Sequence, residues 1–246
     1  MDVSFIGTGS ALNTALGNNN ALLHAEQGDI FLDCGETNFK QIMKLGLLSG
    51  KEEIVVLISH THSDHIASLG SMVSHSFNEM EPKRKKKIKI LVPSPIVVDV
   101  KQLLRIYGCE SYQYEIVEMR KEYEVYGLKI EYLLNTHVKP LLSFAFVITE
   151  IQTDNVIYYS GDSNEISKDV LTRFISREIT YIYQDTCSID FPDNPHLSLN
   201  KLTELIPISE RSRVTCMHLD EDFNVFLAKK LGFAVASKLE KPLGLS

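Results

Sequence analysis

Short apolar runs alternate with longer amphipathic segments along most of the chain. The runs are rich in Val, Ile, Leu and aromatic residues and are bounded by turn residues, which is typical of strands. The expected strands are Val3–Ile6, Ala21–Ala25, Ile30–Leu32, Ile54–Ile58, Ile88–Val92, Tyr114–Val117, Leu128–Leu134, Ser143–Ile148, Val156–Tyr159, Thr180–Gln184 and Arg213–Cys216. The expected helices are Asn38–Leu45, Ile66–Phe77, Ile96–Tyr107, Lys168–Ile175, Leu199–Ile206 and Phe223–Leu231. Gly46, Gly108 and Gly232 directly follow three of these helices, and a glycine there commonly ends a helix.

This order of elements predicts a layered α/β fold. Strands followed by helices in both halves of the chain indicate two sheets that face each other, with helices on the outer faces. The chain has 246 residues and 44% apolar residues, so it can bury a sizeable core. No linker rich in Pro, Gly or Ser divides it. We therefore expect one domain over residues 1–246, built as a four-layer αβ/βα sandwich.

Four metal-seeking side chains follow the apolar run Ile54–Ile58 directly: His60, His62, Asp64 and His65. Buried groups this polar need a partner, and imidazole and carboxylate suit Zn²⁺ well and Mn²⁺ or Fe less well. In an extended segment His60 and His62 point the same way and can hold one ion. Asp64 and His65 follow where the chain turns, so they can face a second ion. An ordinary hydrogen-bonded polar loop is the alternative, but the full H-x-H-x-D-H pattern favours a metal pair.

The pattern H-x-H-x-D-H is the signature of the metallo-β-lactamase fold, and this sequence resembles that superfamily. The resemblance implies three further ligands, and His137, Asp162 and His218 each follow an apolar run in the required order. Taken singly, each could be a hydrogen-bonded histidine, a turn residue or a helix cap. The ligand sets implied by the resemblance are His60, His62 and His137 for one ion and Asp64, His65 and His218 for the other, with Asp162 shared.

Three segments near the N-terminus narrow the resemblance. Phe5–Ala11, Asn19–Leu23 and Phe31–Glu36 together look like the start of the ribonuclease Z-like phosphodiesterases. Asp33, within the third segment, either orients a metal ligand by hydrogen bonding or caps a turn.

Two further residues fit a phosphodiesterase of this branch. His196 resembles the catalytic histidine that these enzymes carry between the bridging Asp and the last His. Asp185 stands where the family often has Glu in an H-E-A-T stretch, and a carboxylate there could orient His196 and raise its pKa, as a general acid requires. With Asp64, they are the expected catalytic residues. Asp is shorter than Glu, however, so a plain loop histidine and a turn-forming Asp remain the alternatives.

The chain departs from ribonuclease Z where that family grips tRNA. The resemblance places a basic arm between the third-motif His and the bridging Asp, but His137 and Asp162 are only 25 positions apart. One hairpin over Leu141–Tyr159 uses that length. The net charge of −7 also disfavours a long polyanion. We expect the one basic run, Lys83–Lys87, to form a solvated loop, with phosphate steering or a dimer contact as alternatives.

In length and motif order the chain is most similar to the anti-Pycsar proteins of phages and bacteria. That resemblance implies hydrolysis of 3′,5′-cyclic nucleotides, including cyclic CMP and cyclic UMP, with cyclic AMP and cyclic GMP as further candidates. Such an activity would silence a nucleotide-signalled antiviral defence. The resemblance also implies a homodimer in which a loop of one subunit covers the site of the other. Tyr112 and Tyr114 in Gly108–Tyr126 could stack on a base from such a loop, although core or hairpin packing is the alternative.

Two other functions stay open at this point. One is a ribonuclease Z-like RNA or DNA phosphodiesterase, and the other is a protein that sequesters nucleotides without hydrolysing them. The first strand begins at Val3, which leaves no room for a signal peptide, and no apolar stretch approaches membrane-spanning length. We expect a cytoplasmic protein (in the host cell if a phage encodes it) with four reduced, buried cysteines and no membrane partner.

Overall fold

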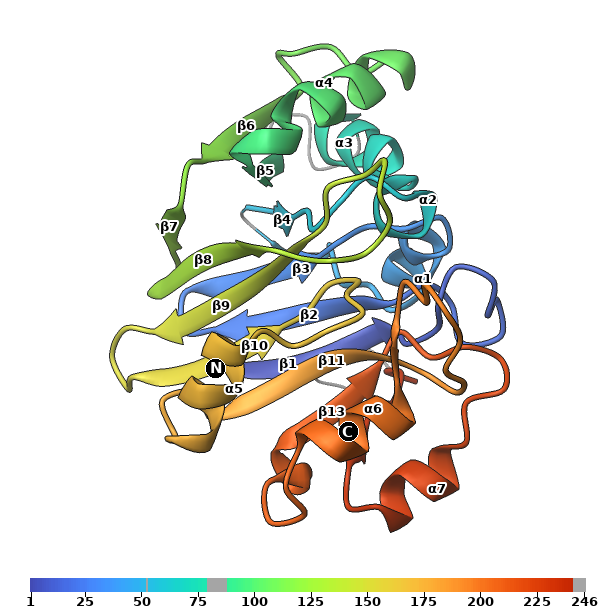
Figure 1. Ribbon diagram of the computed structural model, residues 1–246. Helices are drawn as coiled ribbons and strands as arrows, with labels where there is room; N and C mark the ends of the chain where they lie inside the picture. The colour runs from blue at the N-terminus through green and yellow to red at the C-terminus, as the bar shows by residue number, and fades with distance from the viewer. Residues whose placement is uncertain (52, 79–87, 241–246) are drawn as a thin grey trace.

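The structure is a computed structural model that describes residues 1–51, 53–78 and 88–240. Two sheets face each other, and helices lie on the outer side of each sheet (Figure 1). The helices α1 to α4 belong to the first sheet, and α5 to α7 belong to the second (Figure 1). This is the four-layer arrangement that the sequence predicts.

The first sheet contains six strands in chain order. They are β1 Asp2–Gly7, β2 Asn20–Ala25, β3 Gly28–Leu32, β4 Val55–Leu57, β5 Ile88–Pro93 and β6 Tyr114–Met119. The first three strands pair antiparallel, and the later ones pair parallel. Parallel neighbours need a crossover between them, and helices supply it here. These helices are α1 Asn38–Lys44, α2 Ser63–Ile66, α3 Leu69–Asn78 and α4 Val97–Ile106, with a 3₁₀ turn at Ser94–Ile96.

The second sheet has the order β14-β13-β11-β10-β9-β8-β7, and β12 pairs with β11. Its strands are β7 Glu122–Val125, β8 Leu128–Leu134, β9 Phe144–Glu150, β10 Asn155–Tyr159, β11 Tyr181–Cys187, β12 Leu197–Ser198, β13 Val214–Met217 and β14 Ala234–Val235. The covering helices are α5 Lys168–Ile175, α6 Leu199–Leu205 and α7 Val225–Lys230, with a 3₁₀ turn at Arg211–Arg213.

Side-chain alternation along β10 divides the core into two parts. Ile157 and Tyr159 join the cluster that also contains residues of the first sheet. Val156 and Tyr158 point the other way and join the cluster beneath α5, α6 and α7. Because successive strand residues face opposite sides, one apolar strand can serve both layers. This explains why the strand reads as a continuous apolar run rather than an alternating one.

Every strand expected from the sequence is present, and β7, β12 and β14 are additional. The strand β7 has only exposed and half-buried residues, and the other two have two residues each, so their apolar signal is weak. The expected helix Ile66–Phe77 is wrong at its start, because α2 begins within the metal motif and a break separates it from α3. At this break the backbone N–H of Ser68 donates to the Cys34 carbonyl oxygen (3.0 Å), which draws the chain out of the helix.

Four smaller predictions concern the helix-ending glycines, the cysteines, membrane-spanning helices and the basic run. Gly46, Gly108 and Gly232 have φ angles of 65°, 77° and 98°, as helix-ending glycines should. All four cysteines are buried and free of disulfides. In the described part of the chain, no helix has the length and apolar character that crossing a bilayer requires. The basic run Lys83–Lys87 lies outside the described residues.

The strands β6 and β7 occupy most of the segment Gly108–Tyr126, which agrees with the expected strand Tyr114–Val117 and favours the packing alternative over a covering loop. Tyr114 lies in β6 and packs against the core. Tyr112 is 57% exposed, and its ring lies 5.3 Å from that of Phe77. Packing within the subunit therefore accounts for Tyr114, while Tyr112 retains an exposed face.

Candidate metal centre

The candidate ligands meet at one rim of the sandwich because each follows the end of a strand. His60 follows β4, His137 follows β8, Asp162 follows β10 and His218 follows β13. Three of these strands belong to the second sheet and one belongs to the first sheet, so both sheets contribute to the site. The aligned strand ends explain how residues far apart in the sequence converge.

The backbone around the metal motif turns sharply after His62. This residue is extended, with φ −63° and ψ 150°, and it is the N-cap position of α2. The extended part carries His60 and His62, while the helical turn carries Asp64 and His65 toward a different point. Gly35 lets this turn pack closely, since a Cβ there would lie 1.7 Å from the Asp64 carbonyl oxygen. The turn that the sequence predicted between the two halves of the motif is therefore a short helix.

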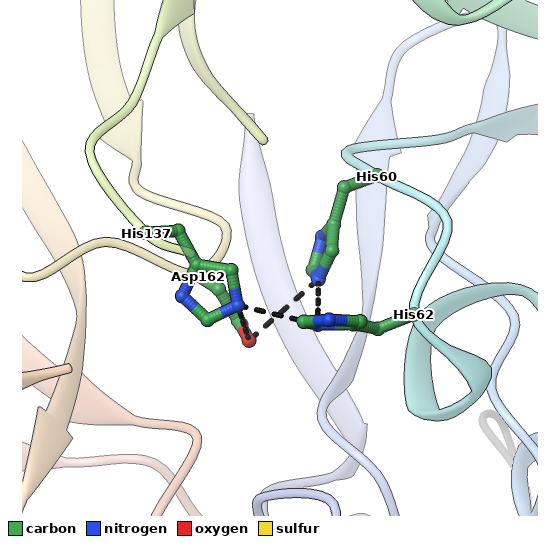
Figure 2. A group of neighbouring side chains, drawn as sticks. All are labelled: His60, His62, His137 and Asp162. Carbon is green, nitrogen blue, oxygen red and sulfur yellow. Dashed lines mark hydrogen bonds and ion pairs between the residues drawn. The ribbon is translucent and has the colours of Figure 1, made fainter. Parts of the chain in front are cut away.

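His60, His62, His137 and Asp162 form the first group (Figure 2). The Nδ1 atom of His62 lies 3.2 Å from Nε2 of His60 and 3.2 Å from Nε2 of His137. Oδ2 of Asp162 lies 3.7 Å from the same two Nε2 atoms. Three imidazoles and one carboxylate oxygen thus point toward a common centre, as Figure 2 shows.

Asp64, His65, His218 and Asp162 form the second group, and all four are buried. Oδ2 of Asp64 lies 3.3 Å from Nε2 of His65 and 3.2 Å from Nε2 of His218. Oδ1 of Asp162 lies 3.1 Å from Nε2 of His65 and 3.4 Å from Nε2 of His218. Asp162 therefore offers one oxygen to each group.

Two buried atoms in the second group lack a hydrogen bond. Nε2 of His65 and Oδ1 of Asp162 face each other, but neither has a hydrogen-bond partner among the described residues. Buried polar atoms are normally paired, so this arrangement fits atoms that are ligands of a cation. Nitrogen and carboxylate donors in groups of four suit a tetrahedral divalent ion. The clustered residues form a candidate divalent-metal site.

The outward-facing nitrogens of the second group are held by carboxylates. Nδ1 of His65 lies 2.8 Å from Oδ2 of Asp33, and Nδ1 of His218 lies 3.2 Å from Oδ1 of Asp185. Asp33 has a left-handed backbone, with φ 68°, and it also accepts hydrogen bonds from the backbone N–H and the hydroxyl of Ser59, both at 2.7 Å. A carboxylate behind a ligating imidazole fixes its orientation and increases its basicity. Of the two roles that the sequence left open for Asp33, the structure supports orientation of a neighbouring histidine.

In the first group, the outward-facing Nδ1 atoms of His60 and His137 contact neutral groups instead of carboxylates. The Ser59 hydroxyl oxygen lies 3.0 Å from Nδ1 of His60. Nδ1 of His137 lies 3.0 Å from the carbonyl oxygen of Pro195, to which it can donate. These contacts orient the rings without placing a formal negative charge behind them.

The different surroundings shift the pKa values of the two groups in opposite directions. Burial lowers the pKa of His60 well below its usual value, and the neighbouring His65 lowers it further. Burial and the nearby His137 also lower the pKa of His62. For His218, burial lowers the pKa, but the carboxylates Asp162 and Asp185 outweigh it and raise the value to about 10.

His196 lies beside the second group and carries a carboxylate partner of its own. Its Nδ1 is 2.6 Å from Oδ2 of Asp185, and its side chain is 25% exposed. Its ring centroid lies 5.0 Å from that of His218 and 5.3 Å from that of His137. Burial lowers the pKa of His196, but the charge of Asp185 more than offsets this and the net pKa is raised. The structure therefore places Asp185 in contact with His196, which is the pairing that the sequence suggested.

Two residues that hold the turn carrying Asp162, Asn135 and Ser143, were not predicted from the sequence. Asn135 donates through Nδ2 to the carbonyl oxygens of Ser160 (2.5 Å) and Asp162 (3.1 Å), and Ser143 donates through its hydroxyl to the Asp162 carbonyl oxygen (2.9 Å). These bonds fix the turn that carries the shared carboxylate. The only signal in the sequence was the position of Asn135 two residues before His137.

Known proteins resemble this chain in sequence and in fold. An anti-Pycsar protein Apyc1 of Paenibacillus xerothermodurans is 26% identical over 242 residues, which cover 93% of this chain and 92% of that protein. An anti-Pycsar protein Apyc1 of Bacillus phage vB_BsuM-Goe3 is 26% identical over 251 residues and covers 92% of each chain. The crystal structure of the metallo-β-lactamase fold protein YhfI from Bacillus subtilis superposes with a TM-score of 0.70 at 15% identity over 96% of each chain.

The structural similarity at this low identity bears on the fold, which is the metallo-β-lactamase fold that the motif predicts. The sequence profile described as "Anti-Pycsar protein Apyc1" matches residues 1–239. Because that match extends over nearly the whole chain, this protein belongs to the anti-Pycsar Apyc1 family.

Proposed function

We propose that this protein is a metal-dependent phosphodiesterase that hydrolyses 3′,5′-cyclic nucleotides to nucleoside monophosphates. The observation that carries the proposal is the pair of four-ligand groups that share Asp162, with His196 beside them. Relatives named anti-Pycsar proteins support a role against cyclic-nucleotide antiviral signalling. Cyclic CMP and cyclic UMP are the first substrates to test, followed by cyclic AMP and cyclic GMP.

The ligand set fits two divalent cations, with Zn²⁺ as the first candidate and Mn²⁺ as the second. His60, His62 and His137 would hold one ion and Asp64, His65 and His218 the other, with Asp162 between them. When bound, such a pair supplies an activated water and positive charge at the phosphoryl oxygens.

His196 is placed to act as the general acid. Its Nδ1 is occupied by Asp185, so its Nε2 is the nitrogen left to face a substrate. The raised pKa keeps the ring protonated to higher pH than an ordinary histidine. In the proposed step, a water molecule gives one proton to solvent and adds to phosphorus, the bond to a ribose oxygen breaks, and that oxygen takes the proton from His196.

The described surface supports a small substrate over a long one. The strands β9 and β10 form one antiparallel hairpin between His137 and Asp162, which leaves no chain for a basic arm. The net charge of −7 also works against a polyanion. We expect a homodimer in the cytoplasm of the cell, and light scattering of the purified protein would test the dimer.

The experiment is a substrate panel with and without a chelator. It contains 3′,5′- and 2′,3′-cyclic nucleotides, linear dinucleotides and a precursor tRNA, and mass spectrometry follows each product. Gain of one water by a 3′,5′-cyclic nucleotide, lost on chelation and restored by Zn²⁺ or Mn²⁺, is the expected result. Cleavage of the precursor tRNA alone would point to a ribonuclease, and an unchanged bound nucleotide would point to sequestration.

A further inference from the structure

A cavity of about 330 Å³ opens beside His196. Its lining consists of the segment Ser10–Asn13 on one side and Asp220 and Glu221 on the other, with His196 between. The volume falls at the lower end of the roughly 300–1,000 Å³ that small-molecule pockets occupy. His196 thus borders both the metal centre and the cavity, so a bound substrate can reach from one to the other.

Hydrogen bonds join the two segments that line the cavity, Ser10–Asn13 and the segment that contains Leu219 and Asp220. The backbone N–H of Ser10 donates to the Leu219 carbonyl oxygen (3.0 Å). Nδ2 of Asn13, which is buried, donates to the carbonyl oxygens of Leu219 and Asp220, both at 3.1 Å. These bonds tie the cavity wall to the segment that directly follows His218. The cavity therefore has a fixed position relative to the candidate ligands.

The charge of the cavity is unusual for a site that handles nucleotides. Its two charged residues other than His196 are both acidic, and its lining contains no Lys or Arg. Oδ2 of Asp220 accepts from the backbone N–H (2.7 Å) and the hydroxyl (2.8 Å) of Ser188. Oδ1 of Asp220 is buried and has no partner among the described residues. A carboxylate oxygen in that state is satisfied by a hydrogen-bond donor and disfavours another anion.

We propose that this cavity receives the nucleoside part of the substrate and that Asp220 and Glu221 exclude a second phosphate. The inference rests on the proposed phosphodiesterase activity and specifies its substrate class. With the reacting phosphate at the residues that would hold the cations and the leaving ribose oxygen facing His196, the nucleoside would extend past His196 into the cavity. A nucleoside brings neutral hydroxyl and amino donors, which match carboxylate acceptors. A nucleotide with a further 5′-phosphate brings a like charge to the same wall.

The first test reverses the charge of Glu221 in the cavity lining. Glu221→Lys is compared with Glu221→Gln and the wild type on three substrates: cyclic CMP, the 5′-phosphorylated dinucleotide pCpC and bis(p-nitrophenyl) phosphate. Glu221 is exposed, so the variants should fold. We expect Glu221→Lys to raise kcat/KM for pCpC relative to cyclic CMP by about tenfold, with Glu221→Gln intermediate. An unchanged ratio in both variants would overturn the exclusion of the second phosphate.

The second test fills the cavity. Ala11 lines it from an exposed position, and Ala11→Trp should lower the ratio of kcat/KM for cyclic CMP to that for bis(p-nitrophenyl) phosphate by about tenfold or more, because the artificial diester needs no nucleoside site. Val98→Trp, at a position 72% exposed on α4, is the matched control and should leave the ratio at its wild-type value. If Ala11→Trp affects both substrates equally, the cavity is not the nucleoside site.

The two proposals fail in different ways. If the wild type hydrolyses bis(p-nitrophenyl) phosphate but none of the cyclic nucleotides, the proposed function is wrong and the cavity assignment is wrong with it. If the wild type hydrolyses cyclic CMP and the variants change nothing in the substrate ratios, the function stands and only the assignment of the cavity is wrong.

Discussion

The two ligand groups contain the same kinds of side chain but differ in what stands behind them. In the first group, the rings of His60 and His137 rest on a serine hydroxyl and a backbone carbonyl. In the second group, the rings of His65 and His218 rest on the carboxylates of Asp33 and Asp185. The groups also differ in their own donors, since the first has three histidines and one aspartate and the second has two of each. The carboxylates behind the second group increase this difference in charge.

This difference has a direct consequence for metal loading. The lowered pKa values of His60 and His62 mean that these two imidazoles are neutral at pH 7 and can bind a cation without losing a proton. The raised pKa values of His65 and His218 mean that the second group holds protons when no cation is present. A cation entering the second group must displace them. The following predictions test this contrast, from the largest effect to the smallest.

Asp162→Ala should abolish turnover and deplete both metals, because this carboxylate contributes to both groups. We expect activity to fall by at least about 10⁴-fold, to the limit of detection. Metal analysis by inductively coupled plasma mass spectrometry and cyclic nucleotide hydrolysis are the measurements. Asp169→Ala, on the exposed surface of α5, is the control. Retention of both metals in Asp162→Ala would contradict a shared ligand.

His196→Ala should lower kcat by about 10²–10⁴-fold while the metal content stays normal, because His196 contributes a proton rather than a ligand atom. Single-turnover kinetics and metal analysis on one sample separate the two roles. His75→Ala is the control, because the His75 ring packs against Phe39 and belongs to neither group. A wild-type kcat in His196→Ala would remove this residue from the mechanism.

Asp185→Asn should weaken the binding of one metal by about 10–100-fold, because it removes the charge behind His218. Ser59→Ala removes a neutral partner of His60 and one hydrogen bond to Asp33, which keeps its bond from the Ser59 backbone N–H, so this variant should weaken binding less. Titration against a chromophoric chelator gives both stepwise constants. The conservative variant Asp185→Glu should recover part of the loss. Equal losses in Asp185→Asn and Ser59→Ala would break the comparison between the groups.

Metal binding should release protons near neutral pH, and mainly from the second group. The pKa of His218 is raised to about 10, so the ring is protonated below that pH and the metal competes with a proton. Affinity should therefore rise with pH up to about 10. Calorimetry in buffers of different ionisation enthalpy counts the protons released. Asp185→Asn should release fewer protons, and no release in the wild type would show that the second group is already deprotonated.

The sequence predicted that His60–His65 and the three distant candidate ligands would lie together, because a local pattern and the ends of strands determine their positions. His60 to His65 are adjacent in the chain, and each later ligand follows a recognisable apolar run. The contact between Asp185 and His218 could not be predicted in this way. It arises because β11 and β13 pair in parallel with Asp185 opposite Met217, and the register of distant strands is not visible in one sequence. The roles of Asn135 and Ser59 could not be predicted for a similar reason, because they depend on hydrogen bonds to turns that are distant in the sequence.

The carboxylate of Asp185 contacts the imidazoles of both His196 and His218. In the proposed mechanism, a substitution that removes its charge would change both the acid strength of His196 and the basicity of the candidate ligand His218. A substitution at this position would therefore change both histidines at once. Asp185→Glu keeps the carboxylate, so it should change the two histidines least.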